Sequence, residues 1–270
     1  MILTVNHNTT YSYSELLRQS IQVLRLTPFN HQRQTVIDWS ITAPGKITPF
    51  TDCFKNKSHM LLIDDYLTSI TIKAIGKIEV FPSIPNQDKG TLPLEYYLNH
   101  TELANLHSGM IEMAYQSRTE YNPTNSEEPQ VRINMLNHLS SQILATVPYT
   151  RGVTHAANTA SEAFILGGGV CQDHTHIFIA CCRLLKIPAR YVSGYLYTTD
   201  ESHTASHAWA EAWLGNAWYS FDISNQCNAG ESHIEMAYGL DYLDAGPIRG
   251  CRLGGGTEQI SVSSLVSNNQ

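Results

Sequence analysis

The hydrophobic periodicity of the chain changes once, and this change constrains the fold more than any other feature of the sequence. Before residue 81, short apolar runs rich in Ile, Val and Thr alternate with turn-forming groups, in segments 20–26, 34–41, 60–63 and 67–80. That spacing predicts a small antiparallel β-sandwich. After residue 93, apolar residues recur at helical intervals over 95–117, 131–143 and 159–166. The fold class predicted for the whole chain is therefore α+β.

The junction between the two patterns predicts a domain boundary. Pro82, Pro85, Gly90 and Pro93 interrupt any ladder or helix there, because proline lacks a backbone donor and glycine loosens the backbone. We expect a β-sandwich domain over residues 1–85 and a larger core over residues 90–270. A chain of 270 residues is long enough for two such domains, each with a buried core.

Charge and composition exclude several classes of protein. The formal net charge is −7 and no cluster of basic residues offers a surface for phosphates, so a nucleic-acid partner is not expected. The first residues lack the basic and apolar segments of a signal peptide, and no apolar run approaches the roughly 18 residues that cross a bilayer. We therefore expect a cytoplasmic protein with no membrane partner. Its six scattered cysteines are expected to be reduced thiols.

One cysteine stands at a position that favours reactivity. Three glycines at 167–169 precede Cys171, and apolar residues recur beyond it on one face of a helix that must end before Pro188. The helix therefore starts near Cys171, where unpaired N–H groups and the positive end of the helix dipole stabilise a thiolate. The alternative is an ordinary buried thiol. That is our interpretation of Cys181 and Cys182, in the middle of the same helix.

A predicted hairpin supplies a base and an acid. His207 begins an alternating strand, and residues 218–222 form a second strand after a tight turn at 215–216. A two-residue loop makes His207 and Asp222 diagonal neighbours on one face, close enough for their side chains to meet. A three-residue loop would instead place Asp222 on the opposite face, so the hairpin register tests the pairing.

These side chains predict a catalytic triad. Cys171 is the expected nucleophile, His207 the proton carrier and Asp222 the residue that orients the imidazole. A lone histidine is more commonly a surface or packing residue, and His207 stands out only through its hairpin partner. The histidines and acid at 173–176 could be metal ligands, but no Cys-x-x-Cys or His-Glu-x-x-His spacing supports this. No metal and no cofactor is expected.

The residues around this triad resemble the transglutaminase-like superfamily. Three blocks in the expected order carry the resemblance: 168–173, 207–211 and 218–222. Residues 24–28 with the early strands look like the β-rich N-terminal domain of bacterial members, and residues 238–247 look like their C-terminal portion, so nearly the whole chain is covered. The resemblance implies a papain-like core in which helices pack on an antiparallel sheet, with the catalytic positions at the three residues named above.

The resemblance implies a cysteine enzyme but does not choose its reaction. The superfamily includes cross-linking enzymes, peptidases, deglycosylating enzymes and non-catalytic members. We expect an attack on peptide or carboxamide bonds through a thioester, with a protein or peptide as substrate. No calcium loop of the Asp-x-Asp-x-Asp-Gly type is present, which favours hydrolysis over acyl transfer to an amine. The rival is a non-catalytic peptide-binding or scaffolding module in which the thiol is incidental.

The other site residues are inferred from sequence proximity. The backbone N–H at the start of the helix is one oxyanion donor, and Tyr149 or Gln172 is the nearest second one. Trp209 is a candidate for the substrate-binding wall, with core packing as its alternative role. Against the family pattern, His174 stands where an aromatic residue is expected and Leu240 where an arginine is expected. These departures bear on the pocket wall and leave the triad unaffected.

Overall fold

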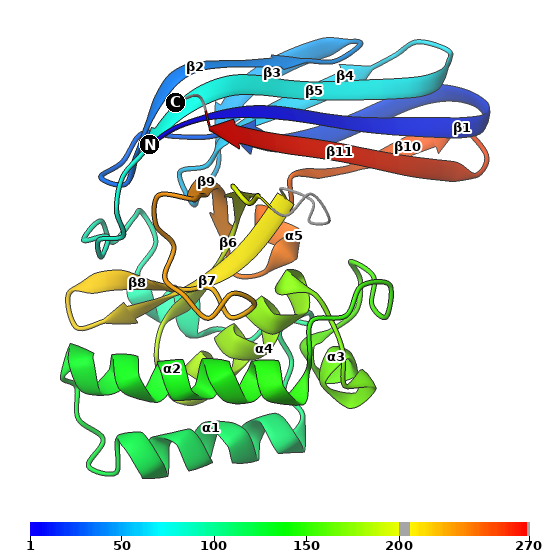
Figure 1. Ribbon diagram of the computed structural model, residues 1–270. Coiled ribbons are helices and arrows are strands. Elements are labelled where there is room, and N and C mark those ends of the chain that lie inside the picture. Colours follow the sequence, from blue (N-terminus) through cyan, green and yellow to red (C-terminus); the bar gives the residue numbers. More distant parts are fainter. Residues whose placement is uncertain (200–205, 269–270) are drawn as a thin grey trace.

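The computed structural model describes residues 1–199 and 206–268 as helices packed with two antiparallel sheets (Figure 1). The larger sheet has the strand order β2-β5-β1-β4-β3, and both β10 and β11 pair with β1. Its strands are β1 (Ile2–Thr27), β2 (Gln34–Thr42), β3 (Lys46–Thr51), β4 (Lys57–Ile63), β5 (Leu67–Val80), β10 (Ile248–Gly254) and β11 (Glu258–Asn268). We call it the N-terminal sheet.

The long strand β1 organises the N-terminal sheet. Its first half, residues 2–13, pairs with β5 and β11, and its second half, residues 17–27, pairs with β4 and β10. The pairing with β5 shifts register between Ser12 and Leu17, and such irregularities let a strand bend. Alternate side chains then face the interior of the bent sheet.

Both halves of the N-terminal sheet contribute to one apolar core. Buried side chains from β1, β4 and β5 meet there: Leu17, Leu24, Leu26, Leu61, Ile63, Ile70 and Ile72. The β-rich region predicted from the sequence is therefore present. The strands that pair with the first half of β1 and those that pair with its second half belong to one continuous sheet, joined through β1.

The second sheet has the order β8-β7-β6-β9, and helices cover one of its faces. In Figure 1, α1 and α2 lie on the side away from the N-terminal sheet, and α4 lies between them and the strands. No helix in the described ranges is long and apolar enough to span a bilayer. The elements are η1 (Leu94–Leu98), α1 (Ser108–Tyr121), α2 (Pro129–Thr146), α3 (Ala160–Leu166), α4 (Cys171–Leu184), β6 (Ala189–Leu196), β7 (Ser206–Leu214), β8 (Ala217–Phe221), β9 (His233–Gly239) and α5 (Tyr242–Ala245).

The N-terminal sheet packs directly on this core. Leu3, Val5 and Ile78 from the sheet share a buried cluster with Ile234 and Met236 from β9. Burial of these side chains stabilises the contact by roughly 1.5–3 kcal/mol each relative to exposure. The sheet is therefore held over β6, β9 and α5, as Figure 1 shows.

Two sequence predictions about organisation need correction. The core was predicted to extend over 90–270, but residues 248–268 form β10 and β11, which pair with β1 in the N-terminal sheet. The helical pattern over 95–117 covers only η1 and part of α1. The chain leaves the helical conformation between them, and α1 starts after His107, whose Nδ1 accepts a hydrogen bond from the Gly109 N–H at 3.1 Å.

Candidate active site

Cys171 is the first residue of α4, as the sequence predicts. Asp173 in the first turn folds back, and its Oδ2 accepts hydrogen bonds from the Val170 N–H at 2.8 Å and the Thr154 hydroxyl at 2.7 Å. This cap fixes the start of the helix, where backbone N–H groups lack helical acceptors. Cys171 is unpaired and partly exposed. Its thiol is thus presented at the positive end of the helix dipole.

The local backbone geometry explains why two of the positions before Cys171 are glycines. Gly167 ends α3 in the left-handed conformation, with φ of 66°, which favours glycine. A Cβ on Gly169 would lie 2.8 Å from Oδ2 of Asp173, so a side chain there would displace the cap. These two glycines shape the approach to Cys171 through turn geometry and packing.

The β7–β8 hairpin has the predicted register. Leu214 pairs with Ala217, which leaves a two-residue loop, and Gly215 in that loop has φ of 71°. The ladder ends at the pair Ala210 and Phe221, and Asp222 follows immediately, bridged to Cys227. The parity of the strands therefore puts Asp222 on the face that carries His207.

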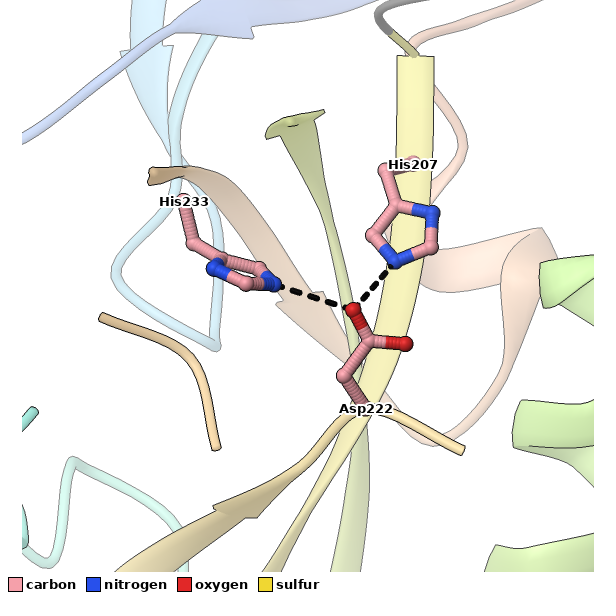
Figure 2. A group of neighbouring side chains, drawn as sticks. All are labelled: His207, Asp222 and His233. Carbon is pink, nitrogen blue, oxygen red and sulfur yellow. Dashed lines mark hydrogen bonds and ion pairs between the residues drawn. The ribbon is translucent and has the colours of Figure 1, made fainter. Parts of the chain in front are cut away.

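His207 and Asp222 are in direct contact, as Figure 2 shows. The Nε2–H of His207 donates to Oδ2 of Asp222 at 2.7 Å. Because Nε2 is occupied, Nδ1 is the nitrogen available to Cys171, which lines the same cavity as the imidazole and whose charge raises the pKa of His207. The helix tip and the hairpin thus bring the three predicted residues together in the order Cys171, His207, Asp222.

The sequence missed two residues that hold the carboxylate. The Nε2–H of His233 donates to the same Oδ2 of Asp222 at 3.0 Å, and Nδ2 of Asn225 donates to it at 2.7 Å. The Gly230 N–H donates to Nδ1 of His233 at 3.3 Å, which leaves the proton of a neutral ring on Nε2. Neither residue belongs to a recognisable motif, and His233 comes from β9, on the far side of β6 from the hairpin. No local sequence signal could have found it.

The charges of the three groups depend on one another. Burial alone would raise the pKa of Asp222, but hydrogen bonds from His207 and His233 hold it well below its usual range. Burial alone would lower the pKa of His207, yet the charge of Cys171 and the hydrogen bonds to Asp222 and Cys171 raise it to about 10. Burial lowers the pKa of His233, which keeps that ring neutral. The protonated imidazole of His207 is therefore stabilised between Cys171 and the carboxylate of Asp222.

The histidine pair and Asp222 also have the spacing of a metal site. One donor atom from each of His207, Asp222 and His233 lies within 4.8 Å of the others. The hydrogen bonds described above already use these atoms, and the partly exposed thiol beside them favours acid–base chemistry. The group predicted as a possible metal cluster at 173–176 has other roles. Asp173 caps α4, and His174 Nε2 and Nδ1 bond to the Val147 carbonyl and the Ser224 hydroxyl at 2.7 and 2.8 Å.

Trp209 does not form the substrate wall suggested by the sequence. Its side chain is fully buried beneath the site, with its ring 6.1 Å from that of His207 and 5.2 Å from that of His233. A Cβ on Gly194 would lie 2.7 Å from the indole, so glycine on the neighbouring strand is what makes room for it. Trp209 supports both imidazoles from within the core.

The two oxyanion candidates both lie near the thiol. Gln172 lines the cavity that contains Cys171, and its Nε2 donates to the Ala156 carbonyl at 2.9 Å. Tyr149 bridges to Gly169 in the loop before α4, and its pKa is raised by burial and by the charge of Cys171. Leu240 stands where the family pattern has an arginine. Its backbone carbonyl accepts a hydrogen bond of 2.5 Å from the buried side chain of Arg183.

A cavity of about 430 Å³ opens onto Cys171 and His207. Its lining comes from the start of α4, strands β6 and β7, α5 with the connection after it, and the N-terminal sheet. The thiol and the imidazole therefore face a space of the size usual for ligand sites.

Comparison with known proteins adds a family relationship. Residues 119–223, which contain the whole triad, match the transglutaminase-like superfamily, and residues 3–79 match the bacterial transglutaminase-like N-terminal region. An uncharacterized protein of Mycobacterium leprae is 27% identical, over 96% of this chain and 96% of its own. One of Mycobacterium tuberculosis is also 27% identical, over 91% of this chain and 86% of its own.

A solved structure shares the complete architecture. It is named "putative cysteine protease", comes from Cytophaga hutchinsonii, and superposes with a TM-score of 0.75 at 18% identity. The superposition covers 100% of this chain and 92% of the other. At that identity the likeness shows a common fold, including the N-terminal sheet.

Proposed function

Because the chain belongs to the transglutaminase-like superfamily, with its core at residues 119–223 and the bacterial N-terminal region at residues 3–79, we propose that it is a cysteine-nucleophile hydrolase of peptide or carboxamide bonds. The observation that carries the proposal is the convergence of Cys171, His207 and Asp222 beside a cavity. The name of the Cytophaga relative agrees with this reaction class.

The proposed reaction has two steps. The Cys171 thiolate attacks the carbonyl carbon, and His207 donates a proton to the leaving amine or ammonia as the carbon–nitrogen bond breaks. Water then attacks the thioester while His207 takes up a proton, which releases a carboxylic acid and restores the Cys171 thiolate and the protonated His207. Asp222 stabilises the imidazolium throughout and fixes its orientation.

The start of α4 supports charge stabilisation in both steps. The backbone N–H of Cys171 lies in the first turn, where N–H groups are unpaired within the helix and the dipole favours negative charge. We propose Gln172 or Tyr149 as the second donor, because both lie near the thiol. Asp173, which caps the same turn, keeps these donors in place.

Hydrolysis is favoured over amine transfer. Cys171 is partly exposed in a cavity open to solvent, and the buried Trp209 does not form a wall that would exclude water. We propose a protein or peptide substrate, because the cavity extends well beyond the reacting thiol. The six unpaired cysteines support our proposal that the protein works in the reducing cytoplasm.

Alkylation with iodoacetamide tests whether Cys171 is an activated nucleophile. We expect Cys171 to react roughly tenfold or more faster than the exposed Cys251 at pH 7, because only the first is paired with an imidazole. Peptide mass spectrometry resolves each thiol in one sample. His207→Ala should abolish the difference, and Cys171→Ser should abolish hydrolysis of a peptide-amide library, whereas Cys251→Ser should not. Equal rates at the two thiols in the native protein would favour the scaffolding alternative.

A further inference from the structure

The N-terminal sheet forms one wall of the active-site cavity. On the β1–β11 ladder, Tyr11 pairs with Ile260 and Thr9 pairs with Val262, and all four residues line the cavity that contains Cys171. They lie on the same face because each pair is two residues from the next. In Figure 1 this part of the sheet runs directly over β6, the upper end of β7 and α5.

This wall is anchored next to the catalytic base. The Ser264 hydroxyl on β11 accepts a hydrogen bond from the backbone N–H of Ser206 at 3.2 Å. Ser206 immediately precedes His207 on β7. The apolar cluster of Leu3 and Val5 with Ile234 holds the adjoining part of the sheet on β9. The wall therefore has a fixed position relative to the thiol and the imidazole.

Apart from Cys171 and His207, the cavity is lined by uncharged side chains, and its wall on the N-terminal sheet is largely apolar. The sheet contributes Tyr11, Ile260, Val262 and Ile248, which is the first residue of β10, and the connection between α5 and β10 contributes Pro247. Among the described lining residues there is no Asp, Glu, Lys or Arg. On the wall itself, the Nε2 of His7 is already hydrogen bonded to the Thr9 hydroxyl at 2.8 Å. A charged side chain packed against this wall would lose water without gaining a counter-charge from it, whereas an apolar side chain would gain by burial.

Two wall residues remain largely exposed in the protein alone. Ile260 is 58% exposed and Val262 is 47% exposed, although both face the cavity. Exposed apolar groups concentrated beside a reactive thiol mark a surface that a ligand covers.

We propose that the N-terminal sheet selects the substrate, by receiving an uncharged apolar or aromatic side chain of the acyl-donor peptide adjacent to the carboxamide that Cys171 attacks. The inference rests on the proposed function and names its substrate class. Strands β10 and β11 follow the core in sequence but belong to the N-terminal sheet. In this proposal they take a direct part in substrate recognition. Charged side chains at that substrate position are disfavoured.

Three alkylating reagents of equal mechanism test this selection. In each, the thiolate displaces iodide and forms a carbon–sulfur bond, but the tails differ: iodoacetamide has none, N-benzyl-iodoacetamide carries an aromatic ring, and iodoacetylglycine carries a carboxylate. The measurement is the ratio of the rates at Cys171 and at the exposed Cys251, which cancels the intrinsic reactivity of each reagent. We expect the benzyl tail to raise this ratio about tenfold, since burial of a ring has that order of effect, and the carboxylate to lower it.

Matched substitutions on β11 locate the effect. Val262→Asp places a charge in the wall and should remove the benzyl preference. Leu265→Asp introduces the same charge on the same strand, but Leu265 is 64% exposed and does not line the cavity, so the preference should remain. Ile260→Ser is a milder second variant. The buried Cys181 and Cys182 report folding in the same spectrum, because they become alkylated only when the core opens.

The outcomes separate this inference from the proposed function. If Cys171 reacts rapidly with iodoacetamide but its ratio is the same for all three reagents, the substrate inference is wrong and the proposed function stands. The substrate inference is also wrong if Val262→Asp and Leu265→Asp change the ratio equally in folded protein. If Cys171 reacts no faster than Cys251 with iodoacetamide itself, the proposed function fails, and the inference fails with it.

Discussion

At the scale of single residues, Asp222 is held by several hydrogen-bond donors in addition to His207. Its Oδ2 accepts hydrogen bonds from His207, His233 and Asn225 at 2.7, 3.0 and 2.7 Å. Its Oδ1 accepts from the backbone N–H of Asn225 at 3.1 Å. A carboxylate with this many donors stays ionised and keeps one orientation. The orientation of His207 therefore depends on residues outside the triad.

His233 can be tested as a positioning residue. We expect His233→Leu to lower kcat by roughly tenfold or more with little change in KM, because Asp222 loses a donor and the imidazole of His207 loses its fixed partner. His233→Gln keeps an N–H donor of similar reach and should recover much of the rate. Steady-state hydrolysis and thermal unfolding of both variants provide the comparison. Equal kcat losses in the Leu and Gln variants would indicate that His233 only fills space.

The pH dependence follows from the pKa of His207. Burial lowers this pKa, but the charge of Cys171 and the hydrogen bonds from His207 to its partners outweigh burial and raise the pKa from 6.5 to about 10, so the imidazolium persists until the pH approaches that value. Proton donation to the leaving amine needs the imidazolium, and hydrolysis should therefore decline as the pH rises through about 10. Alkylation needs only the thiolate and should not decline there. Parallel pH profiles of the two reactions check this, and a hydrolytic decline near pH 7 would contradict it.

At the scale of secondary-structure elements, local patterns predicted the parts that carry the triad. The start of α4 followed from its apolar face and Pro188, and the hairpin register followed from the turn at 215–216. Both depend on neighbours in sequence, which is why they could be deduced. The partnership of Asp222 with His233 depends instead on the β8-β7-β6-β9 strand order, and tertiary packing alone determines that order.

The first half of β1 was missed for a different reason. Residues 6–14 consist of Asn, His, Thr, Tyr and Ser, which lack the aliphatic signal of a strand. They are extended because β5 and β11 pair with them on both sides, so backbone hydrogen bonds decide the structure. Alternate residues of this polar segment face the cavity, among them Thr9 and Tyr11. The unusual composition of this strand is thus connected with the site.

At the scale of the whole molecule, the N-terminal sheet and the core are joined by buried charges as well as by apolar contacts. Arg33, in the loop before β2, donates to Oε1 of Glu211 at 3.2 Å and to the Ala229 carbonyl at 3.0 Å, and it also contacts Glu235. Glu211 lies on β7, which carries His207, and Glu235 lies on β9, which carries His233. One side chain from the N-terminal region therefore ties together the strand that carries the catalytic His207 and the strand that carries the positioning residue His233.

Arg33 should accordingly matter far more than a surface ion pair. We expect Arg33→Ala to lower the free energy of unfolding by about 3–5 kcal/mol, because it leaves the buried Glu235 without a counter-charge, whereas Glu211 keeps its pair with Arg190. The matched control is Lys55→Ala, which breaks the exposed Lys55–Asp88 pair at 3.3 Å and should cost under about 1 kcal/mol. Urea unfolding measures both variants, and the alkylation rate of Cys171 in folded Arg33→Ala should also fall as β7 and β9 loosen. A stability loss no greater than that of Lys55→Ala would mean that apolar packing alone holds the sheet over the active site.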